Sequence, residues 1–235
     1  TYPELHQWSV QHLEAFWEFY RKYSGIRFSR SPDKTLSSLS MPGARWFSGA
    51  ELNYAENLLT APPEKTAILS KIEGRSLQSL TYGALTIQVK RFASSLSRIG
   101  VKQGDQVAGF LPNIPETIIA MLGTSAIGAT WTSCSPDFGP CGVKDRFGQV
   151  EPTVLVCVEG YVYNGKSCSA VDTLNAIIPG IPSLRQIVVV PHDYPTRSGE
   201  SLQFQSVATW DEFVSAGDPA NFSFVQVPFE HPLFI

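Results

Sequence analysis

The sequence lacks both an excess of charge and a long hydrophobic run, and each absence excludes a class of function. Its 18 Lys and Arg residues face 21 Asp and Glu residues, and no basic run is longer than Arg21-Lys22. A nucleic-acid-binding domain usually carries a clustered basic surface, so we expect no nucleic-acid partner. Apolar stretches such as Ile114–Leu122 are short and interrupted by polar residues. Because a membrane-spanning helix needs about 20 apolar residues in a row, we expect no membrane partner either.

Cysteine is scarce as well. Four cysteines in 235 residues are too few for a disulfide framework, and no pair has the C-x-x-C spacing of a metal site. The sequence therefore predicts free thiols in a reducing compartment, and we expect a cytoplasmic protein. Cys134 and Cys141 fall in one predicted loop, where they are either a reactive pair or two unreactive thiols. The absence of an adjacent His or Arg favours unreactive thiols.

Common enzyme signatures are missing too. The sequence contains no GxGxxG, GxxxxGK[ST], GxSxG or HExxH motif. Its four histidines lie in the N-terminal and C-terminal segments, away from the predicted sheet loops; they are His6, His12, His192 and His231. A histidine-centred triad or a zinc site has little support from this distribution, and we expect no metal ligands in this chain.

What the sequence does contain, from about residue 61 onward, is an alternation of short apolar strands and amphipathic helices. The predicted strands are 66–72 and 79–82, which form a hairpin, followed by 106–111, 129–133, 153–158 and 186–190. The predicted helices are 85–99, 116–127, 143–150 and 170–178. Strands that are apolar on both sides and separated by helices are typical of a parallel sheet covered on both faces. The predicted fold class is therefore α/β, with a doubly wound, mainly parallel sheet flanked by helices.

The N-terminal part of the sequence predicts an arm rather than a self-sufficient domain. Apolar residues at steps of three and four predict one helix over Trp8–Tyr23, which Gly25 ends. The Ser-, Pro- and Gly-rich segment Ser29–Gly49 is expected to be an extended connector. Asn53 is expected to cap a short helix over Tyr54–Leu59.

The C-terminal part of the sequence is less regular. Between His192 and Glu230 only one helical turn is predicted, at Trp210–Val214. The final segment, His231–Ile235, begins an apolar strand without a following turn or polar cap. We therefore expect a shortened form of a longer protein, with an unpaired sheet edge through which the chain self-associates.

Ligands of a doubly wound sheet bind beyond the carboxyl ends of its strands, which here means the loops 111–115, 133–142 and 159–166. Asp137 in the second loop is either a general base or a turn or N-cap residue. Lys166 follows an Asn-Gly turn and is either a phosphate contact or a solvated lysine. Considered by type and spacing alone, these residues form no catalytic set.

Several long stretches carry a resemblance to a known family. The segment Arg45–Leu59, RWFSGAELNYAENLL, resembles the WFPGAxLNYAENLL stretch of the acetyl-CoA synthetase-like acyl-CoA synthetases. Further similar stretches are Gly104–Thr117, Trp131–Gly139, Asp145–Gln149 and Glu151–Pro152. Within that group, Gly160–Lys166 and the SCSPDFG form of the preceding loop look most like the acetoacetyl-CoA synthetases. The sequence is thereby identified as a member of the acetyl-CoA synthetase-like branch of the adenylate-forming (AMP-binding) superfamily, from about Trp8 to Ile235.

The resemblance implies an incomplete large domain of an adenylate-forming enzyme. Residues 1–60 would be the acetyl-CoA-synthetase-type N-terminal arm, and residues 61–235 the first part of the AMP-binding (adenylation) domain. In the whole enzyme, acetoacetate and ATP would give acetoacetyl-adenylate and pyrophosphate, with Mg²⁺ offsetting the phosphate charge. The thiol of CoA would then displace AMP and give acetoacetyl-CoA.

The resemblance places no catalytic residue in this chain. The phosphate loop of the family and its catalytic lysine come after the motif that matches His231-Pro232-Leu233. The resemblance therefore implies an acetoacetate–CoA ligase by family. We expect the 235-residue chain alone to be inactive. The alternative is a truncated, non-catalytic paralogue that acts as a binding or oligomerisation module.

Two stretches match family segments that contact CoA. The loop Asp137-Phe138-Gly139 matches the segment along which the pantetheine arm passes, and Lys166 matches a basic residue near the 3′-phosphate. Tyr163 stands where related acetyl-CoA synthetases have a second basic residue. The candidate cofactor-binding residues are therefore Asp137, Phe138, Gly139 and Lys166.

Overall fold

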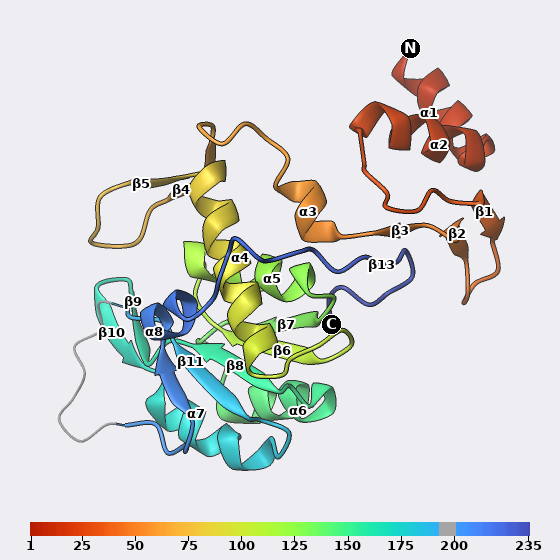
Figure 1. Cartoon of the computed structure of the whole chain (residues 1–235). Coiled ribbons are helices and arrows are strands. Elements are labelled where there is room, and N and C mark those ends of the chain that lie inside the picture. Colours follow the sequence, from red (N-terminus) through yellow and green to blue (C-terminus); the bar gives the residue numbers. More distant parts are fainter. Residues whose placement is uncertain (193–200) are drawn as a thin grey trace.

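The computed structural model describes residues 1–192 and 201–235 (Figure 1). A small N-terminal arm stands beside an α/β body that contains a five-stranded sheet. The predicted irregular tail after His192 falls partly on residues 193–200, which lie outside the described residues. Within the described ranges, no helix is both long enough and apolar enough to cross a membrane.

The arm begins with two helices, so the prediction of a single helix is wrong. They are α1 (Tyr2–Gln11) and α2 (Leu13–Ser24), and they are separated by His12, whose φ of −124° and ψ of 56° are not helical. The break allows the ring of Trp8 to pack edge-on against Phe16, with 6.0 Å between the ring centroids. Gly25, at a φ of +68°, ends α2 as expected, because glycine adopts the left-handed conformation without strain.

The expected connector is a hairpin rather than an extended segment. Strand β1 (Lys34–Ser38) pairs antiparallel with β2 (Arg45–Ser48). Trp46 of β2 packs against Trp17 of α2 at 5.9 Å between ring centroids. The turn formers allow the segment to reverse direction, and this aromatic contact holds the resulting hairpin against the helices.

The arm joins the body through a short strand pair and a buried asparagine. Strand β3 (Glu51–Leu52) pairs antiparallel with β13 (Val227–Pro228). Asn53 follows and caps α3 (Tyr54–Leu58) as predicted, because its side-chain oxygen accepts from the backbone N–H of Glu56 at 3.1 Å. The carboxamide nitrogen of the same side chain donates to three carbonyls of the body, which belong to Ser125, Ala126 and Val225.

The body begins with the predicted hairpin and helix. Strands β4 (Thr66–Ser70) and β5 (Gln78–Thr81) pair antiparallel, and α4 (Tyr82–Arg98) follows. The remaining elements of the body are β6 (Gln106–Phe110), α5 (Pro115–Ala126), β7 (Thr130–Cys134), α6 (Pro140–Val150), β8 (Val154–Cys157), β9 (Gly160–Tyr163), β10 (Lys166–Ser169), α7 (Val171–Ile177), a 3₁₀ turn (Ile178–Gly180), β11 (Gln186–Val189), β12 (Val207–Thr209) and α8 (Trp210–Ser215).

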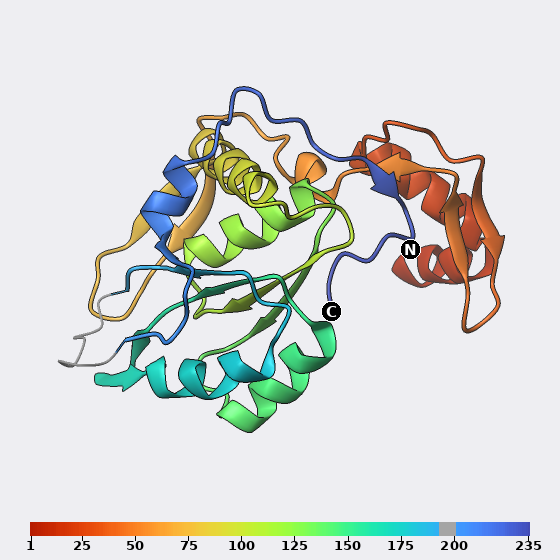
Figure 2. The same cartoon turned by 60° about the horizontal axis from the view of Figure 1, so that its bottom comes forward.

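The main sheet confirms the predicted fold class. Its strand order is β12-β11-β8-β6-β7, and all neighbours are parallel. Helices α4, α5 and α8 cover one face, and α6 and α7 cover the other (Figure 2). Side chains alternate between the faces: Val107 and Val154 belong to the first core, whereas Ala108 and Leu155 belong to the second. The chain therefore builds a doubly wound α/β layer.

Two strand pairings went unpredicted. The expected loop after β8 is an antiparallel hairpin, β9–β10, closed by a two-residue turn between Tyr163 and Lys166. Strand β12 extends the sheet from the C-terminal part that looked irregular. The predicted terminal strand is a single parallel bridge between Phe234 and Trp131, on the outer edge of β7.

Asn53→Ala tests the joint between arm and body. Asn53 is fully buried, so alanine would remove the cap of α3 and three hydrogen bonds from its carboxamide to carbonyls of the body. We expect the free energy of unfolding in urea to fall by about 3 kcal/mol. The exposed control Asn221→Ala should change it by less than about 0.5 kcal/mol. Equal losses in the two variants would show that Asn53 does not hold the joint.

Candidate functional site

The strand order of the sheet predicts a ligand site at the carboxyl ends of its strands. Strand β6 precedes its neighbours in sequence, with β7 on one side and β8 on the other. The direction of the chain along the sheet reverses there, and open α/β sheets bind ligands in the crevice at such a point. The three loops that sequence analysis selected all follow β6, β7 or β8 and therefore lie at this edge.

The loop after β7 is a tight turn that leads into α6. The backbone N–H of Phe138 donates to the carbonyl of Ser135 at 3.1 Å, which closes the turn around Asp137. Gly139 is the N-cap residue of α6 and Pro140 its first helical residue. The N-cap alternative for Asp137 is therefore wrong, and its turn role is confirmed. Proline explains the placement, because it is favoured at the first helical position.

An aromatic ring and a guanidinium form the exposed surface of this loop. The side chain of Phe138 is 42% exposed, and the guanidinium carbon of Arg146 lies 4.9 Å from the centroid of its ring. A side-chain carbon placed at Gly139 would meet no atom within 4 Å, so the backbone there is open to an incoming group. The loop thus offers an apolar wall, open backbone and a nearby cation.

The β9–β10 hairpin follows β8 at the same carboxyl edge of the sheet. Burial raises the pKa of Tyr161, and the neighbouring Cys168 thiol and Asp137 carboxylate raise it further. Tyr161 pairs with Cys168, whereas Lys166 lies two register positions nearer the turn, opposite Tyr163. The structure therefore places Lys166 at the exposed tip of the hairpin.

Sequence reasoning missed two neighbours of these residues. Arg146 lies on α6, and its guanidinium packs back onto the ring of Phe138. Glu73 lies in the turn between β4 and β5, and its carboxylate accepts from the backbone N–H groups of Asn164 and Gly165. A contact across more than ninety residues leaves no local signal in the sequence.

The cysteines agree with the unreactive interpretation at two positions. All four are free; Cys134 and Cys157 are buried, and Cys141 is exposed. Burial raises the pKa of Cys134, although Arg146 opposes the shift. Burial and then Glu159 also raise the pKa of Cys157. Cys134 and Cys141 therefore do not form a matched reactive pair.

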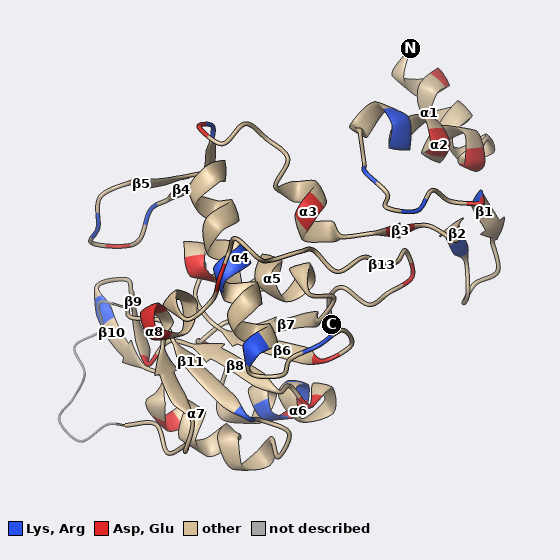
Figure 3. Cartoon of the chain, in the orientation of Figure 1, with Lys and Arg blue, Asp and Glu red and all other residues tan. Residues whose placement is uncertain are grey.

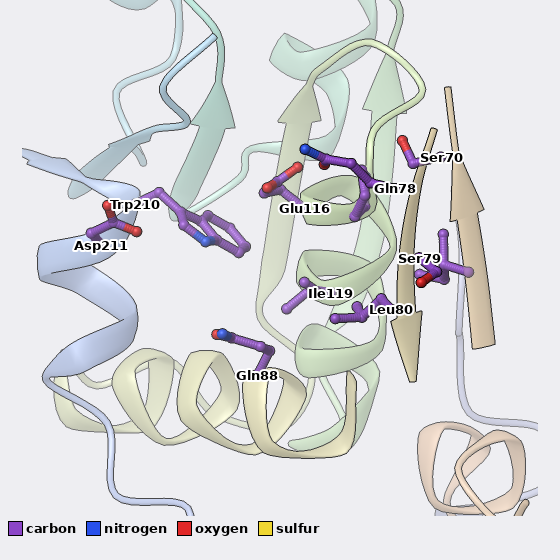
Figure 4. Close-up of a pocket in the computed structure, with 11 residues that line it drawn as sticks. Ser70, Gln78, Ser79, Leu80, Gln88, Glu116, Ile119, Trp210 and Asp211 are labelled. Carbon is purple, nitrogen blue, oxygen red and sulfur yellow. The ribbon is translucent and has the colours of Figure 1, made fainter. Parts of the chain in front are cut away.

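A separate pocket of about 270 Å³ lies between the β4–β5 hairpin and the starts of α5 and α8 (Figure 4). Trp210 and Ile119 supply part of its apolar wall, and Glu116 and Asp211 supply two carboxylates. The described residues that line it include no lysine or arginine. Such a pocket does not suit a phosphate group, and none of the four candidate CoA contacts lines it.

A site for Mg²⁺ and ATP requires metal ligands and a cradle for the triphosphate. Among residues 1–192 and 201–235, no group of three or more His, Cys, Asp or Glu side chains is arranged to hold a metal ion. A triphosphate also requires a basic or glycine-rich cradle, which the pocket beside Trp210 does not provide. The groups this edge offers fit CoA better, since they combine an apolar wall with an exposed lysine.

Fold and sequence together define the class. The chain belongs to the AMP-binding enzyme family, whose sequence model matches residues 55–226. The model described as the acetyl-coenzyme A synthetase N-terminus matches residues 2–58. The fold is accordingly that of the first part of an adenylate-forming domain.

Individual relatives show which members of the family the chain resembles. The chain is 38% identical to the acetoacetyl-CoA synthetase of Xenopus tropicalis, and the match covers all of this chain and 36% of that protein. It is 34% identical to the malonamoyl-CoA synthetase of Penicillium aethiopicum, and this match covers all of the chain and 34% of that protein. Its structure is similar to that of the acetoacetyl-CoA synthetase from Streptomyces lividans, with a TM-score of 0.90 and 39% identity over 99% of this chain and 35% of that one. The predicted resemblance to the acetoacetyl-CoA synthetases is confirmed, and the chain spans about a third of the length of the relatives it matches.

Alkylation of the native chain tests the assignment of the thiols. At pH 8, iodoacetamide should modify exposed Cys141 at least about a hundredfold faster than buried Cys157, whose raised pKa keeps the thiol neutral and whose access requires local opening. Mass spectrometry of peptides gives both rates, and the difference should vanish in urea. Equal rates in the native chain would contradict the buried, neutral thiol.

Proposed function

We propose that this chain is part of an acid–thiol ligase that uses ATP and Mg²⁺ to activate acetoacetate as acetoacetyl-adenylate and then forms acetoacetyl-CoA, AMP and pyrophosphate. Its similarity to acetoacetyl-CoA synthetases supports the proposal. Residues 1–60 act as the N-terminal arm and residues 61–235 as the first part of the adenylation domain. The Penicillium relative is a malonamoyl-CoA synthetase, so the choice of acetoacetate is tested below against other short acids.

The contribution of this chain is to bind CoA at the carboxyl edge of the sheet. CoA, when bound, supplies the thiol that takes up the acyl group. Asp137, Phe138 and Gly139 line the path of its pantetheine arm, where open backbone and an exposed ring suit a narrow chain of methylenes and amides. Lys166 contacts the 3′-phosphate from the tip of the β9–β10 hairpin. The observation that carries this proposal is that the loop of Asp137 follows β7 and the hairpin of Lys166 follows β8, so both lie at the carboxyl edge of one parallel sheet.

Titration with CoA and with 3′-dephospho-CoA tests the role of Lys166. The chain should bind CoA about fivefold more tightly, because only CoA carries the phosphate that an exposed lysine can neutralise. Lys166→Ala should remove this preference and leave the affinity for 3′-dephospho-CoA unchanged. The control Lys102→Ala removes an exposed lysine before β6, at the opposite edge of the sheet, and should keep the preference. A preference that survives in Lys166→Ala would contradict the assignment.

A second candidate function, a non-catalytic module that binds or oligomerises, has its own structural support. Neither α1 nor α2 contains a buried residue, and exposed aromatic side chains such as Phe19 and Tyr23 remain on α2. Strand β7 is the last strand of the sheet, and the terminal segment bridges it only at Trp131. Both features favour self-association.

Two measurements on the 235-residue chain separate these functions. Light scattering after size-exclusion chromatography should show a mass that rises with concentration, and a constant monomer would contradict self-association through the β7 edge. Pyrophosphate exchange into ATP with acetoacetate should be undetectable, since the sequence has no phosphate loop. The same exchange assay on a full-length protein with a panel of short acids should select acetoacetate; exchange with no acid would leave the non-catalytic module as the function.

A further inference from the structure

The turns of two hairpins that are distant in sequence are joined by one carboxylate. Glu73 lies in the turn between β4 and β5, and the tips of the β4–β5 and β9–β10 hairpins lie side by side (Figure 1). Its Oε2 accepts from the backbone N–H of Asn164 at 2.9 Å, and its Oε1 accepts from the backbone N–H of Gly165 at 2.5 Å. Both carboxylate oxygens are thus held by consecutive backbone donors.

The β9–β10 turn is built to hold an anion. Asn164 and Gly165 have φ values of +50° and +71°, so both are left-handed, and they form the two-residue connection between paired Tyr163 and Lys166. Asparagine followed by glycine is the preferred sequence for such a turn. Two successive N–H groups that converge on one acceptor make a backbone nest, which favours phosphate and carboxylate oxygens.

Basic residues lie close in sequence both to this nest and to Glu73. Lys166 follows Gly165 directly in the chain. Lys71 and Arg75 flank Glu73, and the ammonium of Lys71 donates to the carbonyl of Arg75 across the β4–β5 turn. Figure 3 shows basic segments at the tips of both hairpins. Three basic residues thus lie within two positions of Glu73 or directly after the turn in sequence, and two backbone donors hold the carboxylate.

We propose that the Glu73 carboxylate is an internal, displaceable ligand of the Asn164–Gly165 turn, which an incoming phosphomonoester replaces. Glu73, Asn164, Gly165 and Lys166 are all exposed, so the carboxylate can leave the nest without opening the core. A phosphomonoester carries nearly two negative charges at pH 7 and three acceptor oxygens, so it satisfies both N–H groups and Lys166 together. The choice of the 3′-phosphate of CoA as the natural occupant rests on the proposed function; the displacement by phosphate does not.

Displacement sets the affinity of the site. While Glu73 occupies the nest, only the fraction of molecules with an open turn binds phosphate, and the apparent affinity falls by that fraction. For an exposed contact of this kind the expected reduction is about fivefold. The same contact ties the β4–β5 hairpin to the β9–β10 hairpin, so an incoming phosphate would release one from the other.

Calorimetric titration with adenosine 3′,5′-bisphosphate at low salt tests the proposal. Glu73→Ala should bind about fivefold more tightly than the unchanged chain, because the nest is then empty of its competitor. Glu73→Gln should gain less, since a carboxamide oxygen still accepts from the turn but carries no charge. The control Glu14→Ala removes an equal charge from α2 in the arm and should leave the affinity within a factor of two.

Different results would contradict the displacement of Glu73 by phosphate and the binding of CoA through Lys166. An affinity that is unchanged or weaker in both Glu73 variants would overturn displacement by phosphate, even if CoA is bound through Lys166. Tighter binding of inorganic phosphate by Glu73→Ala, without any gain for the bisphosphate, would support the site and overturn only its assignment to CoA. Thermal unfolding of each variant gives a further readout: phosphate should raise the melting temperature of Glu73→Ala more than that of the unchanged chain.

Discussion

The rest of the structure depends on burying the central strands of the sheet on both faces. All four residues of β8 are buried, as are four of the five residues of β6. A parallel strand of this kind needs helices above and below it, and parallel neighbours require a crossover connection between strands. The crossovers through α5 and α6 supply those helices. Because the strands run the same way, the same constraint gathers the loops after β6, β7 and β8 at one edge, which holds the candidate site residues.

Charge distinguishes two places at that edge. The pocket beside Trp210 is lined by the carboxylates of Glu116 and Asp211, whereas the tips of the two hairpins carry basic residues. Anionic ligands are therefore expected at the β9–β10 hairpin rather than in that pocket. The β4–β5 hairpin borders both places, since Gln78 lines the pocket and the Glu73 carboxylate accepts from the β9–β10 turn.

Local pattern was enough to predict the body but not its long-range contacts. Helix α4 follows from apolar residues at steps of three and four, and the cap at Asn53 follows from its residue type. The break at His12 did not follow, because contacts between aromatic rings decide it. The candidate residue Lys166 could be placed at a strand end from sequence, yet its neighbour Glu73 could not, since that contact joins turns of two separate hairpins. Membership of the family came from long matching stretches, and no single residue carried it.

Hydrogen exchange with and without CoA tests the central claim most directly, namely that the loops after β7 and β8 are the ligand-binding face of this chain. The account predicts slower exchange at residues 133–142 and 160–169, faster exchange around Glu73, and no change at residues 210–211. Protection of residues 68–80 together with residues 210–211, and none at 160–169, would place the ligand in the pocket beside Trp210 and contradict the account.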